Sequence, residues 1–257
     1  MFRRLITGFT LLRHSGMVRI VLDQLERNPD SRLINSAVRY LRSQDRNLKT
    51  INDRLSTFLI DNKLLFPYQE AHCLMIMRYQ RDLTSELWKE AKKRLRRKSE
   101  HWYVRQWAAQ LISLKQLSRK ELDSLRKLAF AEENTEVKRA LLQALVQLPQ
   151  KDLIFLNKEL LYETGPKIQR MGRYFDGMLS DREKAEKQIN SLFHNLREEV
   201  LVDRLYEVEL LSRAKDSEIR KNLLGKLKGV RRRLHRPLLK TRVATIIAKL
   251  EKELKQS

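Results

Sequence analysis

The residues best suited to bind a ligand are two dense runs of lysine and arginine. The first surrounds Leu95 with six cations: Lys92, Lys93, Arg94, Arg96, Arg97 and Lys98. The second spans residues 226–242 without one acidic residue and contains Lys226, Lys228, Arg231, Arg232, Arg233, Arg236, Lys240 and Arg242. Because such cations neutralise phosphates and release counterions, both runs predict salt-sensitive, sequence-independent binding of nucleic acid. The alternative interpretation is a solvated helix face, or cations that complement the dipole of a last helical turn.

An aromatic residue follows the first run. Trp102 falls outside the apolar spacing of Val104, Ala108 and Leu111, which predicts an indole exposed beside the cations. Exposed rings among cations stack on unpaired bases. The alternative for Trp102 is packing onto a neighbouring helix pair. The predicted nucleic-acid-binding residues are therefore Lys92, Lys93, Arg94, Arg96, Arg97, Lys98, Trp102, Lys228, Arg231, Arg232, Arg233 and Arg236.

No pattern for catalysis, metal or cofactor accompanies these runs. The five histidines are scattered, and no two lie three or four residues apart, as a helical metal site requires. Seven dispersed glycines supply neither a phosphate loop nor a dinucleotide fingerprint, and Gly-x-Ser-x-Gly is missing. Acidic pairs such as Glu132–Glu133 are typical of helix starts. The sequence predicts a non-catalytic protein without a cofactor.

The overall charge agrees with a polyanionic partner. Lys and Arg total 54 against 32 acidic residues, giving a net charge of +22, and a field of that sign attracts nucleic acid. The single cysteine, Cys73, cannot form an internal disulfide, which favours a cytoplasmic location. Apolar runs stay below the roughly 18 residues of a membrane helix, so no membrane association is expected.

Helices must position these residues, because glycine and proline are scarce and apolar residues recur at i, i+3, i+4 and i+7. One such set is Val137, Leu141, Ala144, Leu145 and Leu148. The spacing predicts an all-α chain with helices near 15–28, 31–43, 47–60, 67–80, 84–98, 101–115, 118–131, 134–148, 150–163, 166–178, 180–194, 198–213, 216–229 and 237–255. Helix starts are indicated by Ser118 with Glu121 and Ser180 with Glu183, which have the spacing of capping boxes, and by Pro166 and Pro237.

Two of these helices are similar in sequence. Residues 134–145 and 216–227 share four identical positions, and the helix from Trp102 fits more loosely, with Val104-Arg105 in place of Val137-Lys138. A polar turn followed by Val-Lys or Val-Arg and one apolar face resembles the HEAT family over roughly residues 84–230. The resemblance implies a solenoid of stacked antiparallel helix pairs with an extended groove. It divides the chain into an N-terminal helical region, 1–80, and HEAT-like repeats over 81–257 that are continuous with this region. The alternative is an irregular helical bundle.

A narrower resemblance concerns bacterial antiviral defence. Residues 64–72, the basic helix containing Trp88, and the segment from Trp102 to Leu111 resemble the helical C-terminal region of bacterial defence-associated reverse transcriptases. In those proteins a polymerase domain precedes a HEAT-like solenoid and the assembly acts against phage. Here the segment Tyr174-Phe175-Asp176-Gly177 lacks the paired aspartates of a polymerase. The resemblance implies an accessory solenoid, either separate or cut from a longer chain, with any polymerase activity elsewhere and a polymerase as one candidate partner.

Three functions follow, in order of preference. The first is a scaffold that binds RNA or single-stranded DNA through its cations. The second is a protein-interaction scaffold for an acidic partner, with basic residues that steer association. The third is an enzyme acting on nucleic acid, by analogy with repeat-protein DNA glycosylases.

Overall fold

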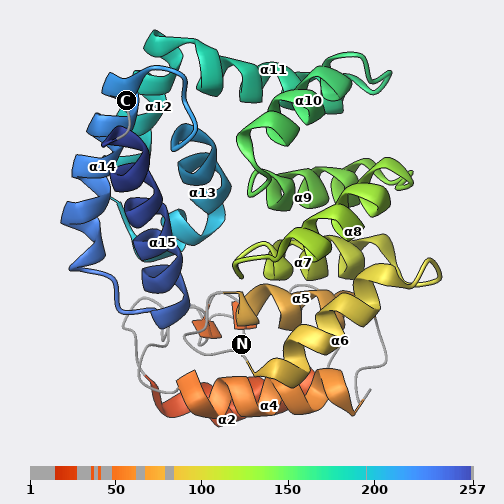
Figure 1. Ribbon diagram of the computed structural model, residues 1–257. Helices are drawn as coiled ribbons and strands as arrows, with labels where there is room; N and C mark the ends of the chain where they lie inside the picture. The colour runs from red at the N-terminus through yellow and green to blue at the C-terminus, as the bar shows by residue number, and fades with distance from the viewer. Residues whose placement is uncertain are drawn as a thin grey trace. The chain divides into compact units, whose positions relative to one another are not determined.

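The described part of the chain is all-helical. The computed structural model describes residues 15–27, 36–37, 40–41, 48–61, 67–78, 84–194 and 196–255. Within them lie thirteen α-helices, one 3-10 helix and no strand (Figure 1), which confirms the predicted all-α class. The elements are η1 Ser15–Met17, α2 Val18–Arg27, α4 Leu48–Ile60, α5 Pro67–Met77, α6 Ser85–Arg96, α7 Trp102–Ile112, α8 Arg119–Phe130, α9 Thr135–Leu145, α10 Gln150–Leu161, α11 Pro166–Ser180, α12 Arg182–Phe193, α13 Glu198–Leu211, α14 Ser217–Arg231 and α15 Pro237–Leu254. The helix predicted near 31–43 lies largely outside the described residues.

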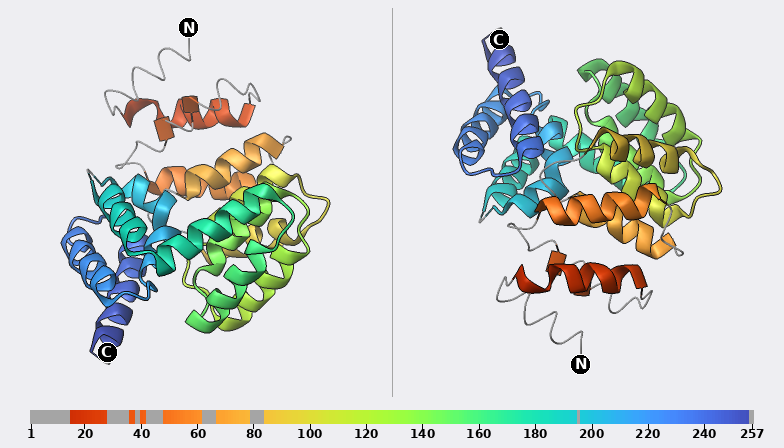
Figure 2. Two further views of the ribbon diagram at one scale, coloured as in Figure 1. Left: turned by 90° about the horizontal axis from the view of Figure 1, so that it is seen from above. Right: turned by 90° about the horizontal axis from the view of Figure 1, so that it is seen from below.

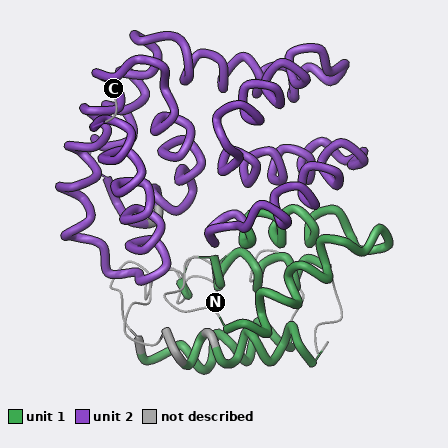
Figure 3. The backbone as a smooth tube through the Cα atoms, viewed as in Figure 1, with its two compact units in different colours: residues 1–112 green, residues 113–257 purple. Residues whose placement is uncertain are grey.

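The chain forms two compact units, residues 1–112 and 113–257 (Figure 3). The sequence instead predicts a division between residues 80 and 81. In the N-terminal unit α5 and α6 both pack on α7, and α4 packs on α5 and α6. Helix α4 contributes Ile51, Leu55 and Leu59 to its core, all fully buried. The three buried residues recur at about one helical turn, so one face of α4 is apolar.

The C-terminal unit is built of helices that pack on their neighbours in sequence. Helix α8 packs on α9, α10 on α11, and α14 on α15; Figures 1 and 2 show the last two side by side. Helices two apart also touch, as α9 does with α11 and α12 with α14. Ion pairs join Arg119 to Asp152 and Arg126 to Glu159, and both link α8 to α10 across 33 residues.

The two helices with similar sequences, α9 and α14, begin in the same way and bury equivalent positions. Asn134 caps α9 and Asp216 caps α14, each accepting a hydrogen bond from a backbone N–H of the first turn. Their apolar positions are buried in equivalent register: Val137, Leu141 and Leu145 in α9, and Ile219, Leu223 and Leu227 in α14. The sequence similarity therefore reflects the same local structure at both places.

The helix starts confirm most of the predicted signals. Ser118 and Glu121 form the predicted capping box, and Pro166 and Pro237 occupy first turns. The capping box predicted for Ser180 is wrong. Helix α11 continues through Ser180, and the Asp181 carboxylate instead accepts a hydrogen bond from the Lys184 N–H at 3.1 Å. A carboxylate caps a helix N-terminus at least as well as a hydroxyl, which accounts for the shift by one residue.

Candidate nucleic-acid interface

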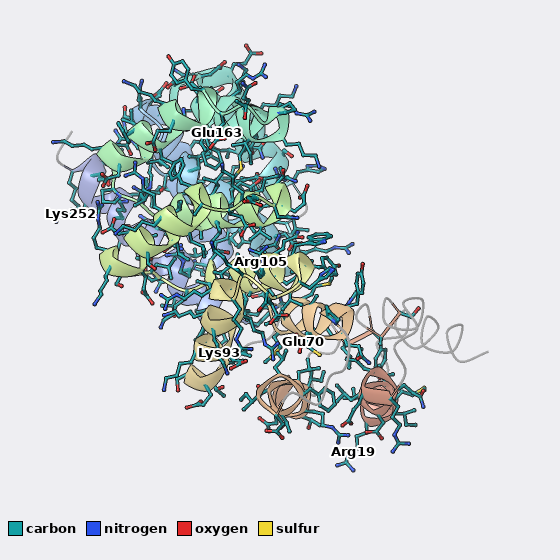
Figure 4. All side chains as sticks on the ribbon, turned by 90° about the vertical axis from the view of Figure 1, so that its right-hand side faces the viewer. Arg19, Glu70, Lys93, Arg105, Glu163 and Lys252 are labelled. Atoms are coloured by element: carbon teal, nitrogen blue, oxygen red, sulfur yellow. The ribbon has the colours of Figure 1, made fainter. Side chains whose placement is uncertain are left out.

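The first basic run occupies the end of α6 and the turn before α7. Thr84 caps this helix, and Leu87, Trp88, Ala91 and Leu95 form its buried face. Lys93, Arg96, Arg97 and Lys98 are exposed, whereas Lys92 is half-buried. Figure 4 shows Lys93 on the outer side of α6. We call the exposed residues Lys93, Arg96, Arg97 and Lys98, together with Trp102, the α6–α7 surface.

Arg94 does not belong to that surface. Its side chain is 2% exposed, and its guanidinium contacts the Glu70 carboxylate at 2.6 Å and the Glu90 carboxylate at 3.3 Å. It also donates a hydrogen bond to the carbonyl of Leu59 at 2.9 Å. A phosphate could reach Arg94 only by displacing these contacts from the protein interior, so Arg94 is withdrawn from the predicted binding residues. Its position seven residues after Leu87, on the buried stripe, is the sequence signal that identifies it.

Trp102 is exposed, as predicted, at the start of α7. Its ring lies 5.6 Å from that of His101 and 5.4 Å from that of Tyr103. The Tyr68 ring, on α5, lies 5.6 Å from both His101 and Tyr103 and is 53% exposed. The indole thus belongs to a group of aromatic rings that the sequence does not reveal, because Tyr68 comes from a different helix.

The second run contains three exposed arginines in succession. Arg231 ends α14, and Arg232 and Arg233 follow in the turn to α15. Among the described residues, no carboxylate lies within 4 Å of any of the three guanidinium groups. Lys226 and Lys240 are exposed as well. We call Lys226, Arg231, Arg232, Arg233 and Lys240 the α14–α15 surface. Nearby, Lys228 is exposed but forms an ion pair with Glu251 at 2.7 Å; such pairs are weak and exchangeable.

Two arginines of this run are buried structural residues. Arg236 is 5% exposed, and its guanidinium and backbone N–H both contact the Glu198 carboxylate, at 3.8 and 3.1 Å. Arg242 is 2% exposed and lies 3.0 Å from Glu209. Burial lowers the pKa of Arg242 from its ordinary value, and the charge of Glu209 acts against that shift. Arg236 is therefore withdrawn from the predicted binding residues.

Two glycines lie among the cations of α14. A Cβ added to Gly225 or Gly229 would meet no atom within 4 Å, and both positions are exposed. Glycine inside a helix costs roughly 1 kcal/mol relative to alanine. Packing within the described structure does not require either glycine. A helix face without side chains permits close approach of a ligand's backbone, next to Lys226 and Lys228.

The described residues offer little support for a metal site, a reactive thiol or a membrane-spanning helix. They contain no cluster of three or more His, Cys, Asp or Glu side chains suited to a metal ion. Cys73 is buried, and burial raises the pKa of its thiol, which disfavours the reactive thiolate. None of the described helices has the length and apolar composition needed to cross a bilayer.

Comparison of the chain with protein-family models, with curated proteins and with solved structures finds no match.

Proposed function

We propose that the protein is a non-catalytic scaffold that binds RNA or single-stranded DNA through its exposed cations. The observation that carries this proposal is the succession Arg231, Arg232 and Arg233, exposed and without a described carboxylate within 4 Å, in a chain of net charge +22. Unpaired guanidinium groups bind phosphates without first breaking an ion pair. Binding through phosphates is independent of base sequence and weakens as salt rises.

The α6–α7 surface supplies the second part of the proposal. Four exposed cations precede Trp102, and Tyr68 lies in the same ring group. Stacking on these rings favours strands with unpaired bases over a duplex, because a duplex keeps its bases stacked within itself. The exposed rings are therefore the reason to propose single-stranded rather than double-stranded ligands.

A HEAT-like stack of helix pairs is our proposal for the C-terminal unit. Its support is the shared capping and burial of α9 and α14, and the two ion pairs that join α8 to α10 at the same separation of 33 residues. That separation equals the offset between the helix from Trp102 and the helix from Thr135 in the sequence. Stacked repeats of nearly constant length place equivalent residues in contact along the stack.

The proposal is tested by reversing the three unpaired arginines to glutamate together. The matched control reverses Lys120, Lys158 and Lys187, which are exposed in the same unit and change the net charge equally. We expect the arginine variant to bind a fluorescent single-stranded RNA at least about tenfold more weakly, with a log–log salt slope smaller by about two. Equal affinities of the two variants, with both folded by circular dichroism, would refute the proposed interface.

A second function is favoured by exposed apolar side chains. On and just after α10, Phe155 is 54% exposed and Tyr162 is 87% exposed; Phe130, at the end of α8, is 38% exposed. Apolar side chains gathered on a surface mark protein interfaces more often than nucleic-acid ones. A protein scaffold, with an acidic protein or a polymerase as partner, is the alternative proposal. Retention of a protein partner after nuclease and high-salt washing, lost in Phe155→Ser, would favour it.

A further inference from the structure

A pocket of about 500 Å³ lies within the C-terminal unit, between α9, α11, α12 and α13. Its volume falls within the range of small-molecule sites. The pocket shares no residue with the α6–α7 or α14–α15 surface. An inference about its ligand therefore does not rest on the proposed function.

A buried carboxylate lines one side of the pocket. Glu207 is 6% exposed and accepts hydrogen bonds from Arg204 at 3.0 Å and from Gln188. Arg204 is the residue at which α13 departs from helical geometry, with φ of −110° and ψ of 15°. Burial is the largest single influence and acts to lower the pKa of the Arg204 guanidinium, but the hydrogen bond to Glu207, the charge of Glu207 and the two nearby tyrosines together raise it. Arg204 therefore remains a cation next to the Glu207 carboxylate.

Cations line the rest of the opening. Arg139 on α9 and Lys167 on α11 share one carboxylate, that of Glu136, at 2.9 and 3.0 Å. Arg170, also on α11, is exposed and donates a hydrogen bond to the carbonyl of Pro166 at 3.3 Å. No carboxylate among the described residues lies within 4 Å of Arg170. Positive charge at the opening therefore exceeds the negative charge that pairs with it.

The inner wall is aromatic and neutral. Tyr174 and Tyr206 are half-buried, and Phe175 behind them is fully buried. Burial, followed by the nearby charge of Glu207, raises the pKa of both tyrosines, so that each keeps its hydroxyl proton. Gln143 and Gln188 add amide groups to the lining. Flat apolar surface with a few amide donors and acceptors is suited to a heteroaromatic ring.

We propose that this pocket binds a nucleoside phosphate, with the phosphate on Arg170, Arg139 and Lys167 and the base against Tyr174 and Tyr206. A simple anion would not need the aromatic wall, and an apolar ligand would not need the cations. The ligand is either a free nucleotide or the phosphorylated end of a nucleic-acid strand, because both present the same group.

Calorimetry with adenosine, guanosine, cytidine and uridine monophosphates tests the pocket. We expect at least one monophosphate to bind with one site per chain, and inorganic phosphate and the parent nucleoside to bind more weakly. Arg170→Ala should weaken binding about tenfold, the loss expected for one charge-assisted hydrogen bond. Arg173→Ala is the matched control, because Arg173 is exposed on the same helix but does not line the pocket.

Glu136→Gln gives a test in the opposite direction. Loss of this carboxylate releases Arg139 and Lys167 from their shared ion pair, so affinity should rise, by about twofold or more. A strand with a 5′-phosphate, compared with the same strand bearing a 5′-hydroxyl, distinguishes a strand end from a free nucleotide. The triple reversal of Arg231, Arg232 and Arg233 should leave monophosphate affinity unchanged.

The outcomes separate this inference from the proposed function. Suppose that strands bind through the three arginines, but no monophosphate binds and a phosphorylated end is not preferred. The pocket proposal is then wrong, while the proposed function stands. The pocket proposal is also wrong if Arg170→Ala and Arg173→Ala bind monophosphates with equal affinity. It is likewise wrong if inorganic phosphate binds as tightly as the monophosphates. If the protein binds monophosphates but no nucleic-acid strand, the proposed function is wrong and the pocket proposal stands.

Discussion

The guanidinium of Arg94 lies 2.6 Å from the carboxylate of Glu70, with both side chains largely removed from solvent. Figure 4 shows Glu70 among the helices of the N-terminal unit. A cation in the middle of a basic run is thus part of the core, between α6 and α5. Substitution of Arg94 and substitution of its exposed neighbours should therefore have different effects on the stability of the fold.

Arg94→Ala should destabilise the protein by about 3–5 kcal/mol, because it leaves the buried carboxylate of Glu70 without its partner. Arg96→Ala, on the exposed side of the same helix, should change stability by less than about 0.5 kcal/mol. Urea unfolding followed by circular dichroism measures both. The assignment fails if the two variants unfold at the same urea concentration.

Substitution by alanine should stabilise the protein at Gly225 and Gly229 but destabilise it at Gly172. Gly225→Ala and Gly229→Ala should each stabilise the protein by about 0.5–1 kcal/mol, since the new Cβ meets nothing. In Gly172→Ala the Cβ would lie 3.0 Å from Leu160 Cβ and 3.2 Å from its backbone carbon. That substitution should cost about 1–3 kcal/mol. Thermal unfolding of the three variants tests the close packing of α11 on α10, and stabilisation by Gly172→Ala would contradict it.

The helices could be predicted from the sequence because caps and apolar spacing are local signals. Ser118 with Glu121, and the matched pair of α9 and α14, needed no tertiary information. The position of Arg94 on the apolar stripe of its helix indicates its burial, but the ion-pair partners of Arg94 and Arg236 could not be predicted locally, since Glu70 and Glu198 come from segments 24 and 38 residues away. The residue types in a run do not distinguish buried cations from exposed ones. In the folded chain, some cations of the same run lie in the core and others on the surface.

The pocket was missed for a related reason. Arg139, Arg170, Gln188 and Glu207 come from four helices, and no short motif joins them. Each residue by itself resembles an ordinary cation, amide or acid on a helix. Only the packing of α11 against α9, α12 and α13 brings them together.

The exposed rings of Trp102, in the α6–α7 surface, and of Tyr68, in the same aromatic group, should matter for unpaired bases only. Trp102→Ala and Tyr68→Ala should each lower the affinity for a single-stranded oligonucleotide by roughly 1–3 kcal/mol, about fivefold to 150-fold, through lost stacking. Affinity for a blunt duplex should not change. Phe155→Ala is the control, because Phe155 is also an exposed aromatic residue but lies on α10. Fluorescence anisotropy measures all three, and an equal loss on duplex and single strand would exclude stacking.

Stability in acid should depend on Glu136. Its hydrogen bond from Lys167, the largest cause, and the charges of Arg139 and Lys167 hold the pKa of Glu136 below its ordinary value of 4.5. The carboxylate therefore stabilises the fold above that value, and its contribution is lost as pH falls through the lowered pKa. The stability difference between wild type and Glu136→Gln should be small, given the partial exposure, and should vanish in strong acid. A difference that grows on acidification would contradict this ion pair.

The most direct measurement of the central claim is the affinity of the nuclease-treated wild-type protein for single-stranded RNA and DNA as a function of salt. We predict binding at about 50 mM salt, with the logarithm of affinity falling linearly against the logarithm of salt concentration up to about 200 mM. The slope should correspond to three or more phosphate contacts, and affinity should be weaker for a duplex. Absence of binding to either strand at the lowest salt, or an affinity that salt does not change, would contradict nucleic-acid binding through the exposed cations.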